Sequence, residues 1–128
     1  MDLVAINKVL KRYRNKKLVY GELDCNLMFL EIFEPELFEI MHGRYTTTMG
    51  GARVAKKETG HSSIKSLVTA SDKYTQKSFN AVSAGDILIN GIHVAICLGH
   101  YTFNLEDDTF KLIETKHFSN CLVFSREQ

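Results

Sequence analysis

Apolar residues recur at helical spacing through the first half of the chain. A helix is predicted over residues 2–14, since apolar positions return every three or four residues opposite a basic face. A second helix, residues 25–33, is apolar on nearly every side and is therefore predicted to be buried. Further helices are predicted over residues 36–42 and 48–59, with a short one at residues 64–68.

After Thr75 the pattern changes to short apolar runs that are separated by turn residues, which is typical of antiparallel strands. Five strands are predicted, over residues 86–90, 92–98, 101–106, 110–114 and 121–124. Helices followed by an antiparallel meander predict the α+β class, with the N-terminal helices packed on a C-terminal five-stranded sheet. A length of 128 residues suits one domain, so residues 1–128 are assigned to a single domain.

Composition and charge narrow the functional classes. The chain is 45% apolar and 24% charged, as in globular proteins, and its net charge of +1 gives no reason to expect nucleic acid or membrane binding. Basic residues crowd positions 8–17, and we interpret them as the solvated face of the first helix and the loop after it rather than a patch for an acidic polymer. No signal peptide or membrane span is recognised, so we expect synthesis in the cytoplasm.

Cysteine and histidine spacing gives no metal or disulfide pattern. The three cysteines are odd in number and lack close pairing, which argues against a disulfide framework. The five histidines are scattered without zinc spacing, and we expect neither a metal nor another cofactor.

Two residues have the placement of a nucleophile and its base. Cys25 opens the predicted buried helix, and Asp24 is its predicted N-cap. The amide hydrogens at a helix N-terminus stabilise a thiolate, which is the nucleophilic form of cysteine. His93 opens a predicted central strand and is the candidate base. The alternatives are a buried structural cysteine and a histidine bonded to backbone at a strand end.

The thiol and the imidazole must also meet in space. His93 shares one strand face with the small residue Ala95 and with Cys97, and a helix can approach this face closely. If the helix of Cys25 packs there, the two groups come together.

A third polar group is needed to orient the imidazole. Gly99 and His100 are predicted to form a tight hairpin turn. If its loop has two residues, Asn104 lies diagonal to His93 and Glu106 lies opposite it, so that either residue could orient the ring. A three-residue loop would turn the alternate residues of the strand to this face. An ordinary exposed polar face is the alternative for both residues.

An oxyanion hole requires donors that are aimed at the developing charge. The backbone N–H of Cys25 is one natural donor, and the hydroxyl of Tyr20 is a candidate second donor. For Tyr20 the alternative is an aromatic ring packed beside a turn.

Five segments together resemble the NlpC-type branch of papain-like cysteine peptidases. They are Tyr20-Gly21, Asp24-Cys25, Gly43-Arg44-Tyr45, Gly85-Asp86-Ile87 and His93-Val94-Ala95-Ile96-Cys97-Leu98-Gly99. The resemblance covers roughly residues 18–106 and is closest to a compact group that is often encoded among phage tail genes. It implies a papain-like fold of the NlpC type.

The resemblance also implies an activity. The protein would hydrolyse an amide bond in the stem peptides of peptidoglycan through a thioester, with Cys25 as nucleophile, His93 as base and Asn104 as the third polar residue. Other phage tail proteins would be its partners, and the protein would be incorporated into the virion. The chain departs from the family pattern after Cys25, where Asn26-Leu27 replaces Ser-Gly, and at Leu18, where a tyrosine is usual.

Two other functions remain open at this point. The first is a structural or assembly component of a phage tail that keeps the fold without useful turnover. The second is a small intracellular hydrolase or transferase that acts on another amide or thioester.

Overall fold

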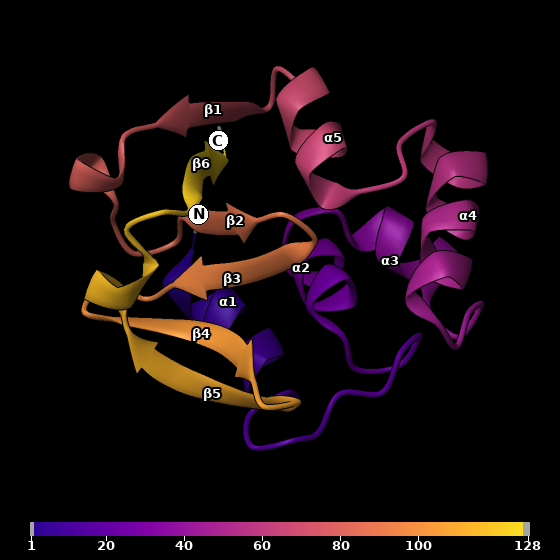
Figure 1. The fold of residues 1–128 in the computed structure, drawn as a ribbon, viewed down its shortest axis with the longest axis horizontal. Helices are drawn as coiled ribbons and strands as arrows, with labels where there is room; N and C mark the ends of the chain where they lie inside the picture. Colours follow the sequence, from indigo (N-terminus) through magenta and orange to yellow (C-terminus); the bar gives the residue numbers. More distant parts are fainter. Residues whose placement is uncertain (1, 127–128) are drawn as a thin grey trace.

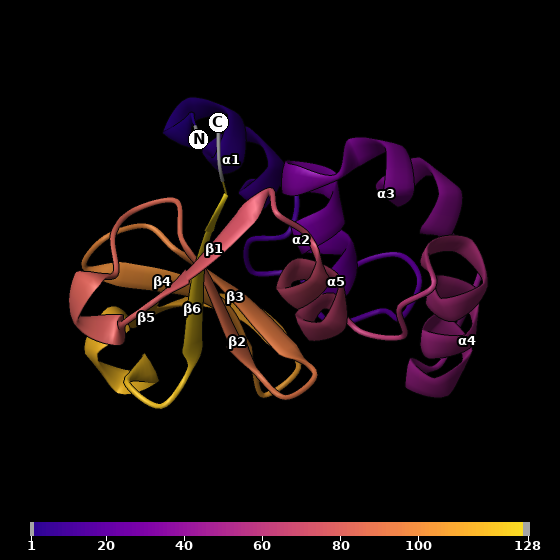
Figure 2. The same cartoon turned by 90° about the horizontal axis from the view of Figure 1, so that it is seen from above.

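A computed structural model describes residues 2–126 (Figure 1). Its helices lie beside an antiparallel sheet, and the domain is of the α+β class, as predicted. Figure 2 shows α2 to α5 grouped on one side of the molecule and the strands on the other, with α1 apart from α4 and α5. The α-helices are α1 (Leu3–Leu10), α2 (Cys25–Phe33), α3 (Pro35–Met41), α4 (Thr48–Thr59) and α5 (Ile64–Ala70).

The helix boundaries follow their capping residues. Side-chain oxygens of Asp2, Asp24, Thr47 and Ser63 accept hydrogen bonds from amides in the first turns of α1, α2, α4 and α5. The helices predicted over residues 25–33 and 48–59 are confirmed. The first predicted helix is too long, because α1 ends at Leu10 and turns follow it.

The sheet has six strands, in the order β1-β6-β2-β3-β4-β5. The strands are β1 (Tyr74–Lys77), β2 (Ile87–Asn90), β3 (His93–Cys97), β4 (Tyr101–Glu106), β5 (Thr109–Glu114) and β6 (Leu122–Arg126). The prediction of five strands is wrong, since it omits β1. Of the four residues of β1 only Tyr74 is buried, so the strand carries no apolar alternation.

The strand order also corrects the predicted meander. Strands β2 to β5 do form a meander, but β6 pairs with β2 and β1 instead of following β5 (Figure 1). Strand β3 is central, as its two apolar faces predicted. The predicted hairpin turn is confirmed as well, and its loop has two residues, because Ile96 pairs with Phe103 and Cys97 pairs with Thr102.

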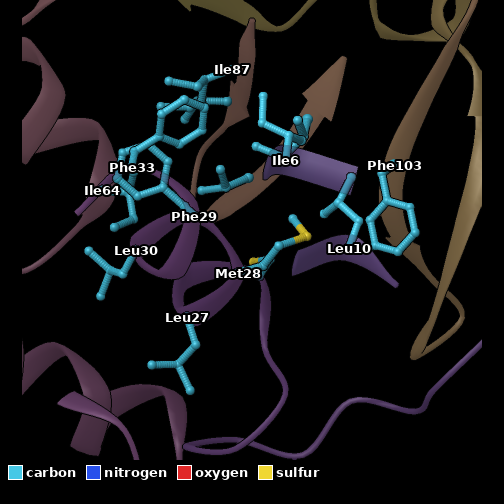
Figure 3. Close-up of a cluster of buried hydrophobic side chains, with 14 of the residues drawn as sticks. Ile6, Leu10, Leu27, Met28, Phe29, Leu30, Phe33, Ile64, Ile87 and Phe103 are labelled. Carbon is cyan, nitrogen blue, oxygen red and sulfur yellow. The ribbon is translucent and has the colours of Figure 1, made fainter. Parts of the chain in front are cut away.

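The two faces of the sheet bury different clusters. The main core joins α2 to one face of the sheet, and Figure 3 shows Met28 and Phe29 of α2 with Ile6, Ile87 and Phe103. The other face has a smaller buried cluster, which consists of Leu88, Ala95, Cys97 and Val123. In β3, therefore, Val94 and Ile96 face the helices, and Ala95 and Cys97 face away from them.

No helix within residues 2–126 has the length and apolar character that a membrane span requires.

Candidate functional site

Asp24 organises the entry to α2. One carboxylate oxygen accepts a hydrogen bond of 2.8 Å from the Leu27 amide, which is the predicted capping interaction. The other accepts 2.9 Å from the Gly21 amide and 2.7 Å from the Tyr45 hydroxyl. Asp24 is only 3% exposed, and these three donors offset the cost of burying its charge. The residue that precedes Cys25 is thereby held from two different segments of the chain.

Gly21 lets these segments approach each other closely. Its φ is +84°, and an added Cβ would lie 1.9 Å from the Tyr45 carbonyl oxygen. Its own carbonyl accepts a hydrogen bond of 2.7 Å from the Gly43 amide. The turn before α2 is therefore fastened to the loop between α3 and α4.

The Cys25 thiol lies against the backbone at the start of β3. The side chain is 8% exposed, and its Sγ donates a hydrogen bond to the Ile92 carbonyl at 3.8 Å. Burial raises the pKa of the thiol to about 11, the Val94 amide opposes this rise, and the negative charge of Asp24 adds to it. The amides of Cys25 and Asn26 also favour the thiolate, as the position at a helix N-terminus predicted. In this geometry burial outweighs the amide donors.

His93 is exposed, and it faces the other side of the sheet. It lines a hollow of about 280 Å³ together with Ala95 and Asn104, next to the small cluster on the face away from α2. The expected approach of α2 to the His93 face does not occur, because α2 packs on the Val94 face. The longer aliphatic side chains lie on that face and bury more apolar surface against a helix. The thiol therefore contacts the backbone next to His93, while the imidazole lies on the opposite face of the sheet.

The structure places the two candidates for the polar group that would orient His93 in different surroundings. Asn104 lines the same hollow as His93, in agreement with the confirmed hairpin register. Glu106 is exposed at the end of β4, opposite Thr109 of β5. Asn104 therefore shares a hollow with His93, whereas Glu106 is not among the residues that line it.

Tyr20, the candidate second oxyanion donor, is 41% exposed. The sequence alone did not predict a role for Tyr45. In the structure its hydroxyl donates a hydrogen bond to Asp24, the residue that precedes Cys25. Burial raises the pKa of Tyr45 above its ordinary range, and the charge and hydrogen bond of Asp24 raise it further. Its position after the Gly43-Arg44 turn was the available signal, but spacing alone does not reveal a contact across 21 residues.

The Gly85-Asp86 pair has a structural role. Asp86 is 4% exposed and accepts hydrogen bonds from the Ser83 amide at 2.8 Å and from Lys77 Nζ at 2.6 Å. It fastens the connection before β2 to the end of β1. Within residues 2–126, no three His, Cys, Asp or Glu side chains form a group that could hold a metal ion.

Fold and site together define an α+β protein with a buried cysteine at the capped N-terminus of a helix. The thiol of this cysteine contacts the backbone directly before a central strand. Residues 3–122 match the model of a protein family described as Domain of unknown function (DUF6950), and the chain belongs to this family. No curated protein matches the chain. No solved structure matches it either.

Proposed function

We propose that the protein is a cysteine hydrolase of the NlpC type, which cleaves an amide bond in peptidoglycan stem peptides as part of a phage tail. One observation carries this proposal. The Cys25 thiol, at the amide-lined start of α2, bonds to the carbonyl of Ile92, and the next residue is His93. Asn104 on the neighbouring strand shares a hollow with His93. The residues to which the resemblance gives the three roles therefore come from neighbouring elements, with Cys25 on one face of the sheet and His93 and Asn104 on the other.

The reaction would proceed in two steps, acylation of the thiol and hydrolysis of the thioester. The His93 imidazole takes the thiol proton of Cys25, the sulfur attacks the carbonyl carbon of the amide, and the C–N bond breaks as the proton passes to the leaving amine. A water molecule then attacks the thioester, its proton returns through the imidazole, and the acid and the free thiol are released. In this mechanism the backbone N–H of Cys25 would donate to the oxyanion of both steps.

This mechanism requires the start of β3 to shift, because His93 lies on the sheet face away from the thiol and successive strand residues point to opposite faces. The His93 side chain is exposed, so its own movement does not displace a buried group. An imidazolium beside the sulfur would lower the pKa of Cys25, which burial alone raises to about 11.

The burial of Cys25 favours a second candidate, a tail component without turnover. A thiol that is 8% exposed, with a pKa of about 11, is protonated at neutral pH and is a poor nucleophile. In this second function the residue only fills the space between α2 and β3.

A cleavage assay on purified peptidoglycan and on its stem peptides tests the hydrolase proposal. We expect wild type to release fragments and Cys25→Ala to release none. Cys97→Ala is the matched control, because Cys97 is also a buried cysteine but does not line the hollow that His93 and Asn104 share, and it should retain wild-type activity. Equal release by wild type and Cys25→Ala would remove Cys25 from catalysis.

The pH dependence of thiol alkylation separates the two candidates. Each cysteine is followed by mass spectrometry during reaction with iodoacetamide. An ion pair with His93 predicts that Cys25 reacts well below the pH at which ordinary thiols do, and that His93→Ala abolishes this early reaction. A space-filling cysteine predicts that reaction rises only toward a pH of about 11, and that it is unchanged in His93→Ala.

A further inference from the structure

A groove of about 580 Å³ lies between α1 and the edge of the sheet that ends in β5. One wall is a single face of α1 and of the turn after it, and the other wall comes from the β3–β4 turn, β4 and β5. Neither Cys25 nor His93 lines the groove, which is therefore separate from the candidate active site.

Backbone hydrogen bonds set the position of the two walls. The turn after α1 pairs with β5, since the Asn15 amide donates to the Phe110 carbonyl and the Phe110 amide donates to the Lys16 carbonyl, both at 3.0 Å. The Leu18 amide donates to the Asp108 carbonyl at 2.8 Å. The separation of α1 from the β4–β5 hairpin is therefore a property of the fold.

The floor of the groove is apolar. Leu10 of α1 and Phe103 of β4 line it and are buried members of the main core (Figure 3). Val4 and Leu112 line the same groove and are 77% and 37% exposed. Exposed apolar side chains that adjoin one another in a hollow indicate an interaction surface, whereas single ones are common on any protein.

The charged residues of the groove all have the same sign. Lys8, Lys11 and Arg14 line it, and no Asp or Glu does. Within residues 2–126 none of these three cations makes an ion pair, in contrast to Arg12, which pairs with Glu31 of α2. Like charges three residues apart on a helix repel each other. An anionic partner would remove this repulsion.

The helix dipole explains only part of this pattern. A cation in the last turn of a helix is favourable, and Lys8 has that position in α1. Lys11 and Arg14 lie at or beyond the end of the helix, and the dipole gives no reason for an exposed apolar residue beside them. A bilayer fits less well than a protein segment, because the buried Leu10 and Phe103 are recessed and cannot enter the acyl chains.

We propose that this groove binds an acidic, amphipathic segment of a partner protein. The aliphatic side chains of the segment enter the groove, and its carboxylates pair with Lys8, Lys11 and Arg14. An apolar centre with a polar rim is the usual anatomy of a protein interface, and complementary charge selects the partner. The inference does not depend on the hydrolase proposal, and binding should be unchanged in Cys25→Ala.

Model peptides test the chemistry of the partner. The probe is a fluorescein-labelled peptide in which pairs of glutamates alternate with pairs of leucines, and fluorescence anisotropy measures its binding to the wild-type protein. We expect saturable binding, which weakens about tenfold or more when serines replace the leucines or when glutamines replace the glutamates. Equal binding of either altered peptide, or no saturable binding of the first one, would overturn the inference.

A matched pair of variants tests the location of the charges. Lys11→Gln/Arg14→Gln removes two cations from the groove, while Arg53→Gln/Lys57→Gln removes two exposed cations from α4, outside it. The net charge falls equally in both proteins. We expect the first variant to bind the glutamate–leucine peptide about fivefold more weakly or worse, and the second to stay within about twofold of wild type. Equal losses would place the peptide elsewhere and overturn the inference.

A second pair tests the apolar part. Val4 and Met49 are both strongly exposed, and each is the second residue of its helix, α1 and α4. We expect Val4→Ser to weaken binding of the same peptide about threefold or more, and Met49→Ser to leave it unchanged. Equal affinities would overturn the inference, because the leucine side chains would then lie outside the groove.

Two other occupants are measured with the same proteins. Sedimentation with phosphatidylglycerol vesicles that is lost in Lys11→Gln/Arg14→Gln, without binding of the glutamate–leucine peptide, would assign the groove to a membrane surface. A dimer in sedimentation equilibrium that is lost in that variant, again without peptide binding, would assign it to a second copy of this chain. Either result would overturn the proposal.

Discussion

The hydroxyl of Tyr45 and the carboxylate of Asp24 lie 2.7 Å apart, and Asp24 is the residue that caps the helix opened by Cys25. Tyr45 belongs to the loop between α3 and α4, so this bond connects the loop to the start of α2. The same carboxylate oxygen also accepts the Gly21 amide. One buried acceptor thus holds together three segments that surround the thiol.

Replacing Tyr45 by phenylalanine tests the strength of this connection. Hydrogen bonds to charged groups contribute about 1.5–3 kcal/mol, so we expect Tyr45→Phe to lower the free energy of unfolding by that amount. Urea denaturation measures the change. Tyr20→Phe is the control, since Tyr20 is 41% exposed, and it should behave like wild type. Equal midpoints for the two variants would show that the Tyr45 hydroxyl adds nothing to stability.

Alkaline pH should weaken the fold in part through the same tyrosine. Because the pKa of Tyr45 is raised in the folded state, its contribution is complete below the ordinary tyrosine pKa of 10.0 and is lost as the pH rises further. The loss is at most about 1.4 kcal/mol for each pH unit above that value. Urea denaturation at about pH 9 and about pH 11 should show a smaller loss for Tyr45→Phe than for wild type. A larger loss in the variant would contradict the assigned direction of the shift.

Gly21 and Gly60 provide a matched pair for backbone strain. Both have positive φ, +84° and +82°, but an added Cβ meets the Tyr45 carbonyl at Gly21 and nothing within 4 Å at Gly60. We expect Gly60→Ala to cost about 1–2 kcal/mol, which is the cost of the left-handed conformation. Gly21→Ala should cost more, about 3 kcal/mol or above, because the backbone must also move. Thermal and urea unfolding of both variants measure the difference, and similar losses would mean that the close approach at Gly21 relaxes easily.

Local patterns predicted the parts of this fold that depend on neighbouring residues. The bounds of α2 and its Asp24 cap follow from an acidic residue before an apolar run. The hairpin register follows from Gly99 at a tight turn, where φ is +106°. The placement of Asn104 on the His93 side follows from that register.

The features that sequence reasoning missed depend on long-range packing. The polar strand β1 exists because β6 supplies its partners, and β6 follows it by more than forty residues. The face of β3 that α2 covers was misjudged because small residues next to His93 suggested a close approach, while the larger aliphatic face buries more surface. The contact of Tyr45 with Asp24 needs the whole α3–α4 connection to be placed first.

The position of β6 has a consequence for the order of assembly during synthesis. This strand lies between β1 and β2, so β1 has no partner in the sheet until residues 122–126 have left the ribosome. A nascent chain can form the helices and the β2–β5 meander early, but one edge of β2 stays open until translation has passed the end of β6. Chaperones that recognise unpaired strand edges would meet this protein in that interval.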